Sequence, residues 1–226
     1  MNTGSNSKDN NSLPLFIEEK DLKLKICGMK FHENIKQVAS LKPDYMGFIF
    51  FEKSPRNFDA EIPEMDKGIK KTGVFVDASL DFVLEKVKKN QLQAVQLHGK
   101  ESPEFCAALK VEDLEIIKVF SVKDSFDFSN LQQYEGKVDF FLFDTKGKAK
   151  GGNGVAFDWE VLKKYPSETP FFLSGGIGLE EVGRLKDFEF PKTFYGIDVN
   201  SRFELEPGFK NLETLKELRK TIIPQR

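Results

Sequence analysis

The chain has 226 residues, which is enough for one large domain with a sizeable core. A net charge of −2 and a pI of about 5.9 give it no electrostatic attraction to nucleic acid or to anionic lipid. No segment approaches the roughly 18 apolar residues of a membrane helix. The sequence therefore predicts neither a nucleic-acid partner nor a membrane partner.

The first 20 residues are polar and contain no apolar signal region. Their composition predicts a flexible N-terminal extension over residues 1–20, and the rest of the chain, residues 21–226, is expected to form a single domain. The two cysteines, Cys27 and Cys106, lie far apart in the sequence, which argues against a disulfide framework and for a reducing, cytoplasmic location.

Eight short apolar runs follow the extension, and each is long enough for a strand. The expected strands cover residues 22–27, 45–51, 72–76, 92–97, 115–120, 138–144, 170–174 and 193–199. Segments with helix-like spacing separate most of them, at residues 33–41, 79–90, 102–110, 178–188 and 211–222. Ser102 and Pro103 are typical of an N-cap followed by the first helical residue. The segment between the second and third strands contains Pro63 and is a poor helix.

Alternating strands and helices are typical of parallel βαβ units, and near-continuous apolar runs fit a sheet covered on both faces. Eight such units predict an α/β fold, a single (β/α)8 TIM barrel. A doubly wound open sheet is the alternative. No GxGxxG follows the first strand, which weakens the dinucleotide-binding form of that alternative.

Polar residues follow several of the expected strands, where a barrel carries its functional groups. Cys27 ends the first strand before Gly28, Asp144 ends the sixth, and Asp198 lies in the eighth. Each has a structural alternative: Cys27 as an inert small hydrophobe, Asp144 as a helix N-cap, and Asp198 as a buried hydrogen-bonding residue. Arg56, after the second strand, could be a solvated loop charge. His98, after the fourth, is better suited to shaping the rim than to carrying protons.

Glycines follow the seventh strand in the segment Ser174-Gly175-Gly176-Ile177-Gly178. They expose backbone N–H groups before a helix, at the position where barrels commonly bind phosphate. This favours a phosphorylated small-molecule ligand. The basic, glycine-rich segment 146–154 is either a solvated linker or a lid over an anionic substrate.

Six segments, in this order and at these spacings, resemble phosphoribosylanthranilate isomerase of tryptophan biosynthesis. They are KICGMK, GFIFFEKSPR, AVQLHG, FLFDTKGKAKGGNGVAFDW, LSGGIG and IDVNSRFE, and the likeness extends from about residue 22 to about residue 222. The resemblance implies an Amadori rearrangement of N-(5-phosphoribosyl)anthranilate to 1-(2-carboxyphenylamino)-1-deoxyribulose 5-phosphate. It implies no cofactor and no metal, which agrees with a chain that has two histidines and no paired-ligand motif.

The resemblance also implies roles for eight residues. Asp144 would be the general acid and Cys27 the general base, while Arg56 would bind the anthranilate carboxylate. The remaining positions would be His98 and Asp198 beside the substrate, and Gly175, Gly176 and Ser201 at the phosphate.

One departure from the family concerns the residues after the eighth strand. The family commonly has Ser-Ser-Gly-Val-Glu where this chain has Asn200-Ser201-Arg202-Phe203-Glu204. Loss of the glycine removes backbone freedom next to the expected phosphate, and Arg202 either adds charge there or points to solvent.

Two other functions fit a barrel of this kind. A related sugar-phosphate isomerase of histidine biosynthesis would have aspartate at the end of the first strand, where this chain has Cys27, and a second phosphate loop. A non-catalytic phosphate-binding barrel would not need both an acid and a base. Family members are often monomers, so we expect a monomer, with a dimer as the alternative.

Overall fold

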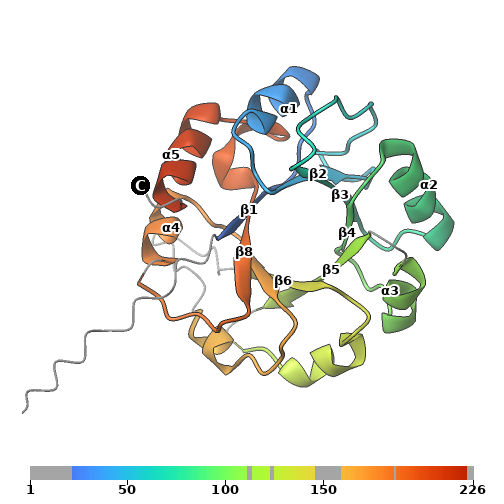
Figure 1. The fold of residues 1–226 in the computed structure, drawn as a ribbon, viewed down its shortest axis with the longest axis vertical. Coiled ribbons are helices and arrows are strands. Elements are labelled where there is room, and N and C mark those ends of the chain that lie inside the picture. Colours follow the sequence, from blue (N-terminus) through green and yellow to red (C-terminus); the bar gives the residue numbers. More distant parts are fainter. Residues whose placement is uncertain (1–21, 111–113, 123–124, 146–158, 186, 223–226) are drawn as a thin grey trace, which may run out of the picture.

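Eight parallel strands close into a barrel in the computed structural model, which describes residues 22–110, 114–122, 125–145, 159–185 and 187–222 (Figure 1). The strands follow chain order around the barrel, and β8 pairs with β1 to close it. Their bounds are β1 Lys23–Ile26, β2 Tyr45–Ile49, β3 Lys70–Phe75, β4 Ala94–Leu97, β5 Glu115–Val122, β6 Phe140–Thr145, β7 Phe171–Ser174 and β8 Phe194–Val199. The predicted (β/α)8 barrel is confirmed. The expected extension over residues 1–20 and the expected lid over 146–154 lie outside the described residues.

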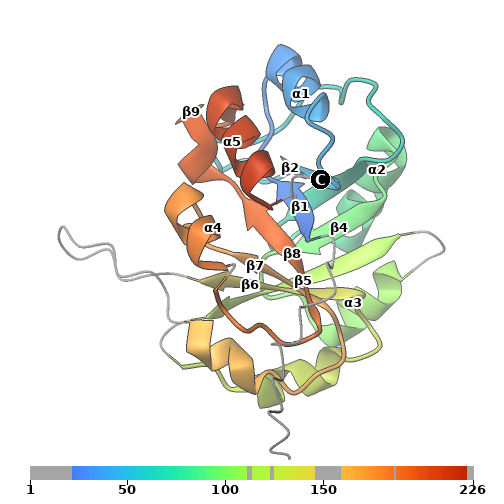
Figure 2. The ribbon, with the colours of Figure 1, turned by 60° about the vertical axis from the view of Figure 1, so that its left-hand side comes forward.

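Helices surround the barrel (Figures 1 and 2). The five expected helices form as α1 His32–Ala39, α2 Leu80–Asn90, α3 Pro103–Leu109, α4 Leu179–Leu185 and α5 Leu212–Ile222. Short 3-10 helices follow other strands, as η1 Phe128–Tyr134, η2 Trp159–Lys164 and η3 Ser201–Phe203. Residues 50–69, between β2 and β3, form no helix, in agreement with the weak helical pattern around Pro63.

Local sequence signals set where two of the helices begin. The Ser79 and Ser102 side chains accept hydrogen bonds from the backbone N–H groups of Phe82 and Phe105, as N-cap residues do. Pro103 occupies the start of α3, where its missing N–H costs nothing. Gln91 ends α2 in the left-handed conformation, with φ of +51°.

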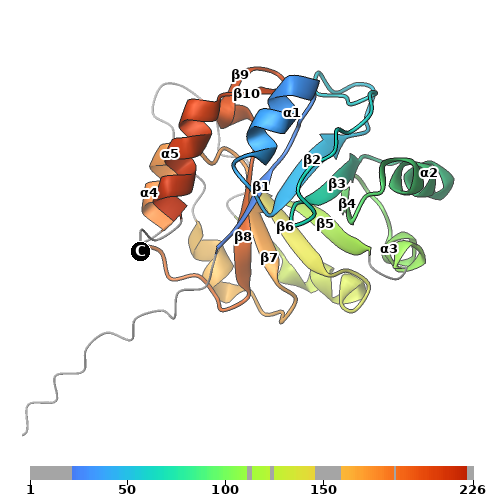
Figure 3. The ribbon, with the colours of Figure 1, turned by 45° about the horizontal axis from the view of Figure 1, so that its top comes forward.

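A small hairpin follows η3 and had no counterpart in the expected elements. It consists of β9 Glu204–Glu206 and β10 Phe209–Lys210, and it lies beside α1 (Figure 3). The Asn34 side chain fixes it there, because it donates to the Lys210 carbonyl oxygen and accepts from the Lys210 N–H. The hairpin thereby brings the side chains of Glu204 and Lys210 to the region where β1 and β8 end.

The core has two parts, as expected for a barrel inside a layer of helices. The larger part lies between the strands and the helices and includes Ile26, Phe48, Val95 and Phe143. The smaller part fills the barrel interior and consists of Tyr45, Ala94, Ile117, Val119, Phe140, Leu142 and Phe172, with Tyr195 against it. The amino-terminal half of the barrel is therefore packed with apolar side chains.

Candidate active site

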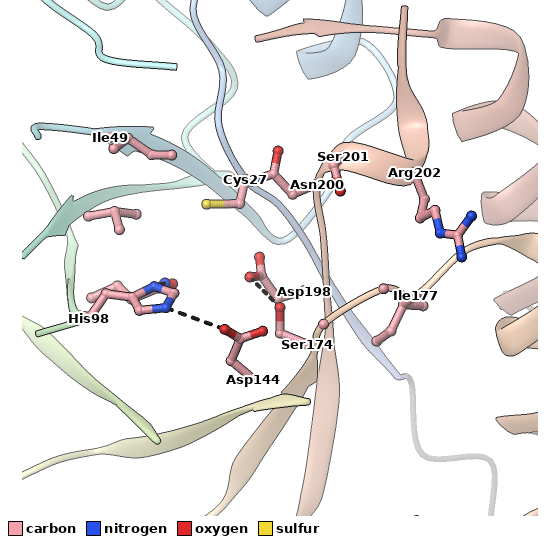
Figure 4. A pocket seen from close by; sticks show the side chains of 14 residues that line it. Cys27, Ile49, His98, Asp144, Ser174, Ile177, Asp198, Asn200, Ser201 and Arg202 are labelled. Carbon is pink, nitrogen blue, oxygen red and sulfur yellow. Dashed lines mark hydrogen bonds and ion pairs between the residues drawn. The ribbon is translucent and has the colours of Figure 1, made fainter. Parts of the chain in front are cut away.

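The candidate site is a cavity at the carboxyl ends of the strands, directly above the interior core. Strand alternation explains its composition, because every second residue of a strand points into the barrel. In β4 the inward series begins at Ala94 and continues through Gln96 to His98, and in β6 it begins at Phe140 and ends at Asp144. The cavity is lined by Cys27, Ile49, Val74, Gln96, His98, Asp144, Ser174, Gly175, Gly176, Ile177, Asp198, Asn200, Ser201 and Arg202 (Figure 4).

Seven of the eight residues expected at the site line this cavity, and Arg56 does not. Figure 4 shows that Cys27 and Asp144 project into the same hollow from different strands. The two residues are 117 positions apart in sequence, since 144 − 27 = 117. The fold therefore brings a thiol and a carboxyl group to one rim, which is the arrangement that acid–base chemistry on a single ligand requires.

Two glycines give the Cys27 thiol its place. A Cβ on Gly47 of β2 would lie 2.7 Å from the Cys27 Sγ, so only glycine leaves room for the sulfur. Gly28 has φ of +75°, a conformation that side chains rarely adopt. A Cβ there would lie 2.7 Å from the Asn200 Oδ1 and 2.8 Å from the Arg56 Cδ. The strand can thus end at the thiol and turn at once.

A buried ion pair lies beneath the thiol. Lys25, two residues before Cys27 on the same strand, is fully buried and places its Nζ 2.8 Å from the Asp198 Oδ1. The other carboxylate oxygen of Asp198 accepts a hydrogen bond from the Ser174 hydroxyl at 3.1 Å. Burial alone would lower the pKa of Lys25, but Asp198, with a smaller contribution from Cys27, raises that pKa above its ordinary value. Lys25 is therefore a buried cation next to the thiol.

The thiol experiences two opposing effects. Burial raises the pKa of Cys27, and the positive charge of Lys25 counteracts part of this rise. The thiolate is the nucleophilic and basic form of cysteine, so a cation at this position increases the population that can accept a proton. By contrast, Cys106 is fully buried on α3 away from the cavity, and burial raises its pKa to about 11.

Asp144 lies at the carboxyl end of β6 with His98 as its neighbour across the rim. The His98 Nε2 is 3.6 Å from the Asp144 Oδ2, and the side chains are 36% and 16% exposed, respectively (Figure 4). The Nδ1 on the far side of the imidazole is 3.3 Å from the Gln96 Nε2. Asp144 is therefore accessible from the cavity and contacts a second titratable side chain.

The loop after β7 contains the glycines that the sequence placed before a helix, and both adopt positive φ. Gly175 and Gly176 have φ of +95° and +68°, and no atom would lie within 4 Å of a Cβ on Gly176. Ser201 and Arg202 line the same end of the cavity, and Arg202 adopts no positive φ. The glycine missing from the segment after β8 is thus not needed for its backbone conformation. The Arg202 side chain does reach the cavity wall.

Arg56 binds a protein carboxylate instead of lining the cavity. Its Nε donates to both oxygens of Glu204, and its Nη2 donates to the Glu204 Oε2 at 2.6 Å. Lys210 donates to the same carboxylate at 2.7 Å. Burial would raise the pKa of Glu204, but the two cations lower it below its ordinary value. The expected role of Arg56 toward a substrate carboxylate stays a prediction.

Several functional positions could not be recognised from the sequence. Lys25 resembles any exposed lysine of an alternating strand, and Gly47 resembles a simple gap in an apolar run. Glu204 comes from a hairpin 148 positions after Arg56. One further position, Gln96, did have a sequence signal, because it is a polar residue among the apolar residues of the expected fourth strand, two positions before His98.

Two other classes of function can be assessed in the described residues. No group of three or more His, Cys, Asp or Glu side chains among them is arranged to hold a metal ion. None of the helices in the described ranges is long and apolar enough to cross a membrane.

A closed (β/α)8 barrel with a thiol, a carboxyl group and a glycine-rich loop at its carboxyl rim defines an enzyme of the acid–base class. The family model described as N-(5'phosphoribosyl)anthranilate (PRA) isomerase matches residues 24–221. A relative from Parabacteroides distasonis, named N-(5'-phosphoribosyl)anthranilate isomerase, is 42% identical over 207 residues, covering 88% of this chain and 93% of the relative. The chain belongs to the phosphoribosylanthranilate isomerase family.

Solved structures agree with this assignment. The phosphoribosylanthranilate isomerase of Thermotoga maritima has a TM-score of 0.74 and 29% identity, covering 89% of this chain and 98% of that one. A second structure of such an isomerase has a TM-score of 0.72 and 27% identity, with the same coverage. That isomerase is in complex with reduced 1-(o-carboxyphenylamino)-1-deoxyribulose 5-phosphate.

The Gly47→Ala substitution tests whether the space beside the thiol matters. The added methyl group would displace the Cys27 sulfur, so we expect isomerase activity to fall by up to about 100-fold, the cost of misplacing a reacting group by about 1 Å. Steady-state kinetics measures this loss. Gly183→Ala on α4 is the matched control, because nothing lies within 4 Å of its Cβ and activity should be unchanged. Equal activity of the two variants would show that the space beside the Cys27 sulfur does not matter for the reaction.

The Lys25→Met substitution tests the electrostatic role of the buried cation. Without the cation the thiol pKa rises, so thiolate formation, and with it the rising limb of activity, should move to higher pH. The rate of Cys27 alkylation by a small haloacetamide, followed against pH, measures this shift directly. The variant also leaves Asp198 unpaired, and we expect a stability loss of about 3–5 kcal/mol. An unmoved alkylation profile in the folded variant would refute the role.

Proposed function

We propose that the protein converts N-(5-phosphoribosyl)anthranilate into 1-(2-carboxyphenylamino)-1-deoxyribulose 5-phosphate, the isomerase step of tryptophan biosynthesis. The observation that carries the proposal is the convergence of Cys27 and Asp144 on one cavity whose other end is formed by Gly175 and Gly176. An acid, a base and a loop suited to an anion are the three elements that this reaction needs. Family membership supplies the identity of the substrate.

Asp144 acts first, as the general acid. It donates a proton to the furanose ring oxygen while the C1–O bond breaks, and the nitrogen lone pair forms the C1=N bond of a cationic Schiff base. Asp144 becomes a carboxylate and C4 of the sugar acquires a hydroxyl group. Its position at the end of β6, next to the His98 imidazole, places a partner beside the carboxylate that this step creates.

Cys27 acts second, as the general base. The Schiff base cation acidifies the C2–H bond, and the thiolate takes this proton while the electron pair forms the C1=C2 bond of an enolamine. The enolamine then tautomerises, since its C2 hydroxyl proton is lost and C1 gains a proton to give the ketone. A moderately basic thiolate is sufficient because the cation is already in place. The positive charge of Lys25 offsets part of the rise in the Cys27 pKa that burial causes.

The phosphate is held at the glycine-rich end of the cavity in this proposal. Gly175, Gly176 and Ser201 contribute backbone N–H groups and a hydroxyl group, and Arg202 adds a positive charge on the same wall. Asp198 and His98 lie beside the sugar. Arg56 binds the anthranilate carboxylate through the edge of its guanidinium that Glu204 does not occupy, for which a planar fork is suited.

We expect Cys27→Ala and Asp144→Asn each to lower kcat by about 10²- to 10⁴-fold, the typical contribution of a positioned acid or base. Both substitutions are small, so the folded structure should be retained. Loss of substrate fluorescence measures turnover, and circular dichroism checks the fold. An Asp144→Asn enzyme with near-full activity would disprove the acid assignment. A wild-type protein that binds the substrate without turnover would be the non-catalytic barrel.

We expect Gly176→Val to raise KM with little change in kcat, because the side chain would project into the space proposed for the phosphate. The positive φ also strains any β-branched residue there, by about 1–3 kcal/mol. Gly136→Val is a matched control, since Gly136 has φ of +72°, no atom within 4 Å of its Cβ and no place in the cavity wall. Both variants should lose similar stability, and an unchanged KM in Gly176→Val would remove this loop from the site.

The proposed assembly is a monomer. Among the described residues, four large hydrophobic side chains are markedly exposed, and they are Phe31, Phe82, Leu84 and Leu205. Only Leu205, at 69%, exceeds about a third by a wide margin. These residues lie on a loop, on α2 and on β9, and a stable dimer needs a larger continuous apolar surface. A dimer remains the alternative, because the relative from Thermotoga maritima is described as dimeric.

A further inference from the structure

A buried glutamine in the cavity wall has no structural explanation. Gln96 is 1% exposed on β4, between Val74 of β3 and Ile117 of β5. Its Oε1 is sealed from solvent and accepts no hydrogen bond from any residue in the described ranges. An unpaired buried acceptor costs about 1–3 kcal/mol, whereas leucine or methionine would fill the same space without this cost. The presence of an amide at this cost therefore indicates a role that requires a hydrogen-bonding side chain.

The polar contact that Gln96 does make is with His98. Its Nε2 lies 3.3 Å from the His98 Nδ1, and on the other side of the ring the His98 Nε2 lies 3.6 Å from the Asp144 Oδ2. The imidazole is thus placed between an amide and a carboxyl group (Figure 4 shows the contact with Asp144). A neutral imidazole has one N–H and one acceptor nitrogen, so the two neighbours together decide which nitrogen holds the proton.

The amide selects the tautomer. An NH₂ group can only donate, so the His98 Nδ1 that faces it must be the acceptor nitrogen. The single proton of the neutral ring then belongs to Nε2 and points toward the Asp144 carboxyl group. This sequence of donors leaves the Asp144 Oδ2 as an acceptor and the Oδ1 as the oxygen that carries the transferable proton.

The reversed amide orientation is less favourable. It would place the Gln96 Oε1 against the His98 Nδ1 and require the proton there. The lone pair of Nε2 would then face Asp144, and it could be paired only if the proton of the acid lay on Oδ2, held against His98 and away from the substrate. Once Asp144 had given up its proton, its carboxylate oxygen would face that lone pair, and two acceptors repel each other. It would leave the amide no better paired, because both buried N–H donors would then lack a partner in place of one N–H and the Oε1.

We propose that Gln96 is a positioning residue that holds neutral His98 as the Nε2–H tautomer, so that this N–H faces Asp144 while Asp144 gives up its proton. The inference rests on the proposed function of Asp144 as the general acid. A donor aimed at the oxygen where negative charge develops stabilises the transition state more than the ground state. The 3.6 Å separation leaves room for this contact to shorten when substrate binds. Gln96 should therefore affect kcat more than KM.

The tautomer can be measured directly, because the chain has only two histidines. In a His32→Asn background, His98 is the single imidazole in a long-range ¹H–¹⁵N correlation spectrum, recorded at a mildly alkaline pH, above the ordinary pKa of an imidazole. His32 is exposed, with Glu33 as its neighbour, so its replacement should leave activity unchanged. We expect the Nε2–H tautomer with Gln96. We expect a mixture with Gln96→Leu and the Nδ1–H tautomer with Gln96→Glu, whose carboxylate accepts.

Kinetics provides the second test. Gln96→Leu should lower kcat by about 10- to 100-fold, the range typical of partners that orient a functional histidine, with a smaller change in KM. If the effect passes through His98, then adding Gln96→Leu to His98→Asn should cause little further loss. A merely structural glutamine would give independent losses in the two backgrounds.

The outcomes separate this inference from the proposed function. The role of Gln96 would be overturned, and the function left standing, by an active isomerase in which His98 is the Nδ1–H tautomer. The same would follow if neither Gln96→Leu nor Gln96→Glu changed the tautomer found with Gln96. A protein without isomerase activity would overturn the function. The tautomer measurement needs no turnover, so it decides the role of Gln96 in either case.

Discussion

The alternation of side chains in a closed parallel barrel is the constraint on which this site depends. Each strand sends every second residue inward, and closure leaves the amino-terminal interior no access to solvent. Aromatic and aliphatic groups such as Tyr45, Phe140 and Phe172 fill that part. Further along the inward series of β4, β6 and β7 come Gln96, Asp144 and Ser174, and they can be polar because they border the cavity. The inward-facing positions that form the core thus continue along each strand as the positions that line the cavity.

A buried charge lies next to the thiol that we propose as the base. The Lys25–Asp198 pair is costly to bury, and an apolar pair of similar size would stabilise the barrel as well or better. Its functional consequence is electrostatic, since the cation acts against the rise in the pKa of Cys27 that burial causes. Ser174 completes the hydrogen bonding of Asp198, so the carboxylate is held between two strands. The stability cost and the partial offset of the Cys27 pKa rise are two results of one arrangement.

The sequence was sufficient for the barrel because its signals are local. Apolar runs and capping residues such as Ser79 and Ser102 depend on a few neighbouring positions, and the order of strands in a parallel barrel follows the order of the chain. Seven of the eight residues expected at the candidate site line the cavity for the same reason, because residues that end strands must share one rim. The glycine directly after Cys27 indicated that the chain turns at this point, and the positive φ of Gly28 explains why a glycine is needed there.

What the sequence could not supply depends on contacts between distant segments. The hairpin β9–β10 decides which carboxylate Arg56 binds, and its position depends on Asn34, more than 160 residues away in the chain. Gly47 matters only because a neighbouring strand brings Cys27 against it. The same holds for Gln96, whose cost in the core makes sense only beside His98. The proposed base and the histidine beside the proposed acid thus each have a buried polar residue two positions earlier in the chain: Lys25 of β1 precedes Cys27, and Gln96 of β4 precedes His98. Where a strand places a side chain at the rim, the preceding inward residue of the same strand lies directly below that side chain. This residue is therefore the nearest position from which a buried polar group can change the charge or tautomer of the side chain at the rim.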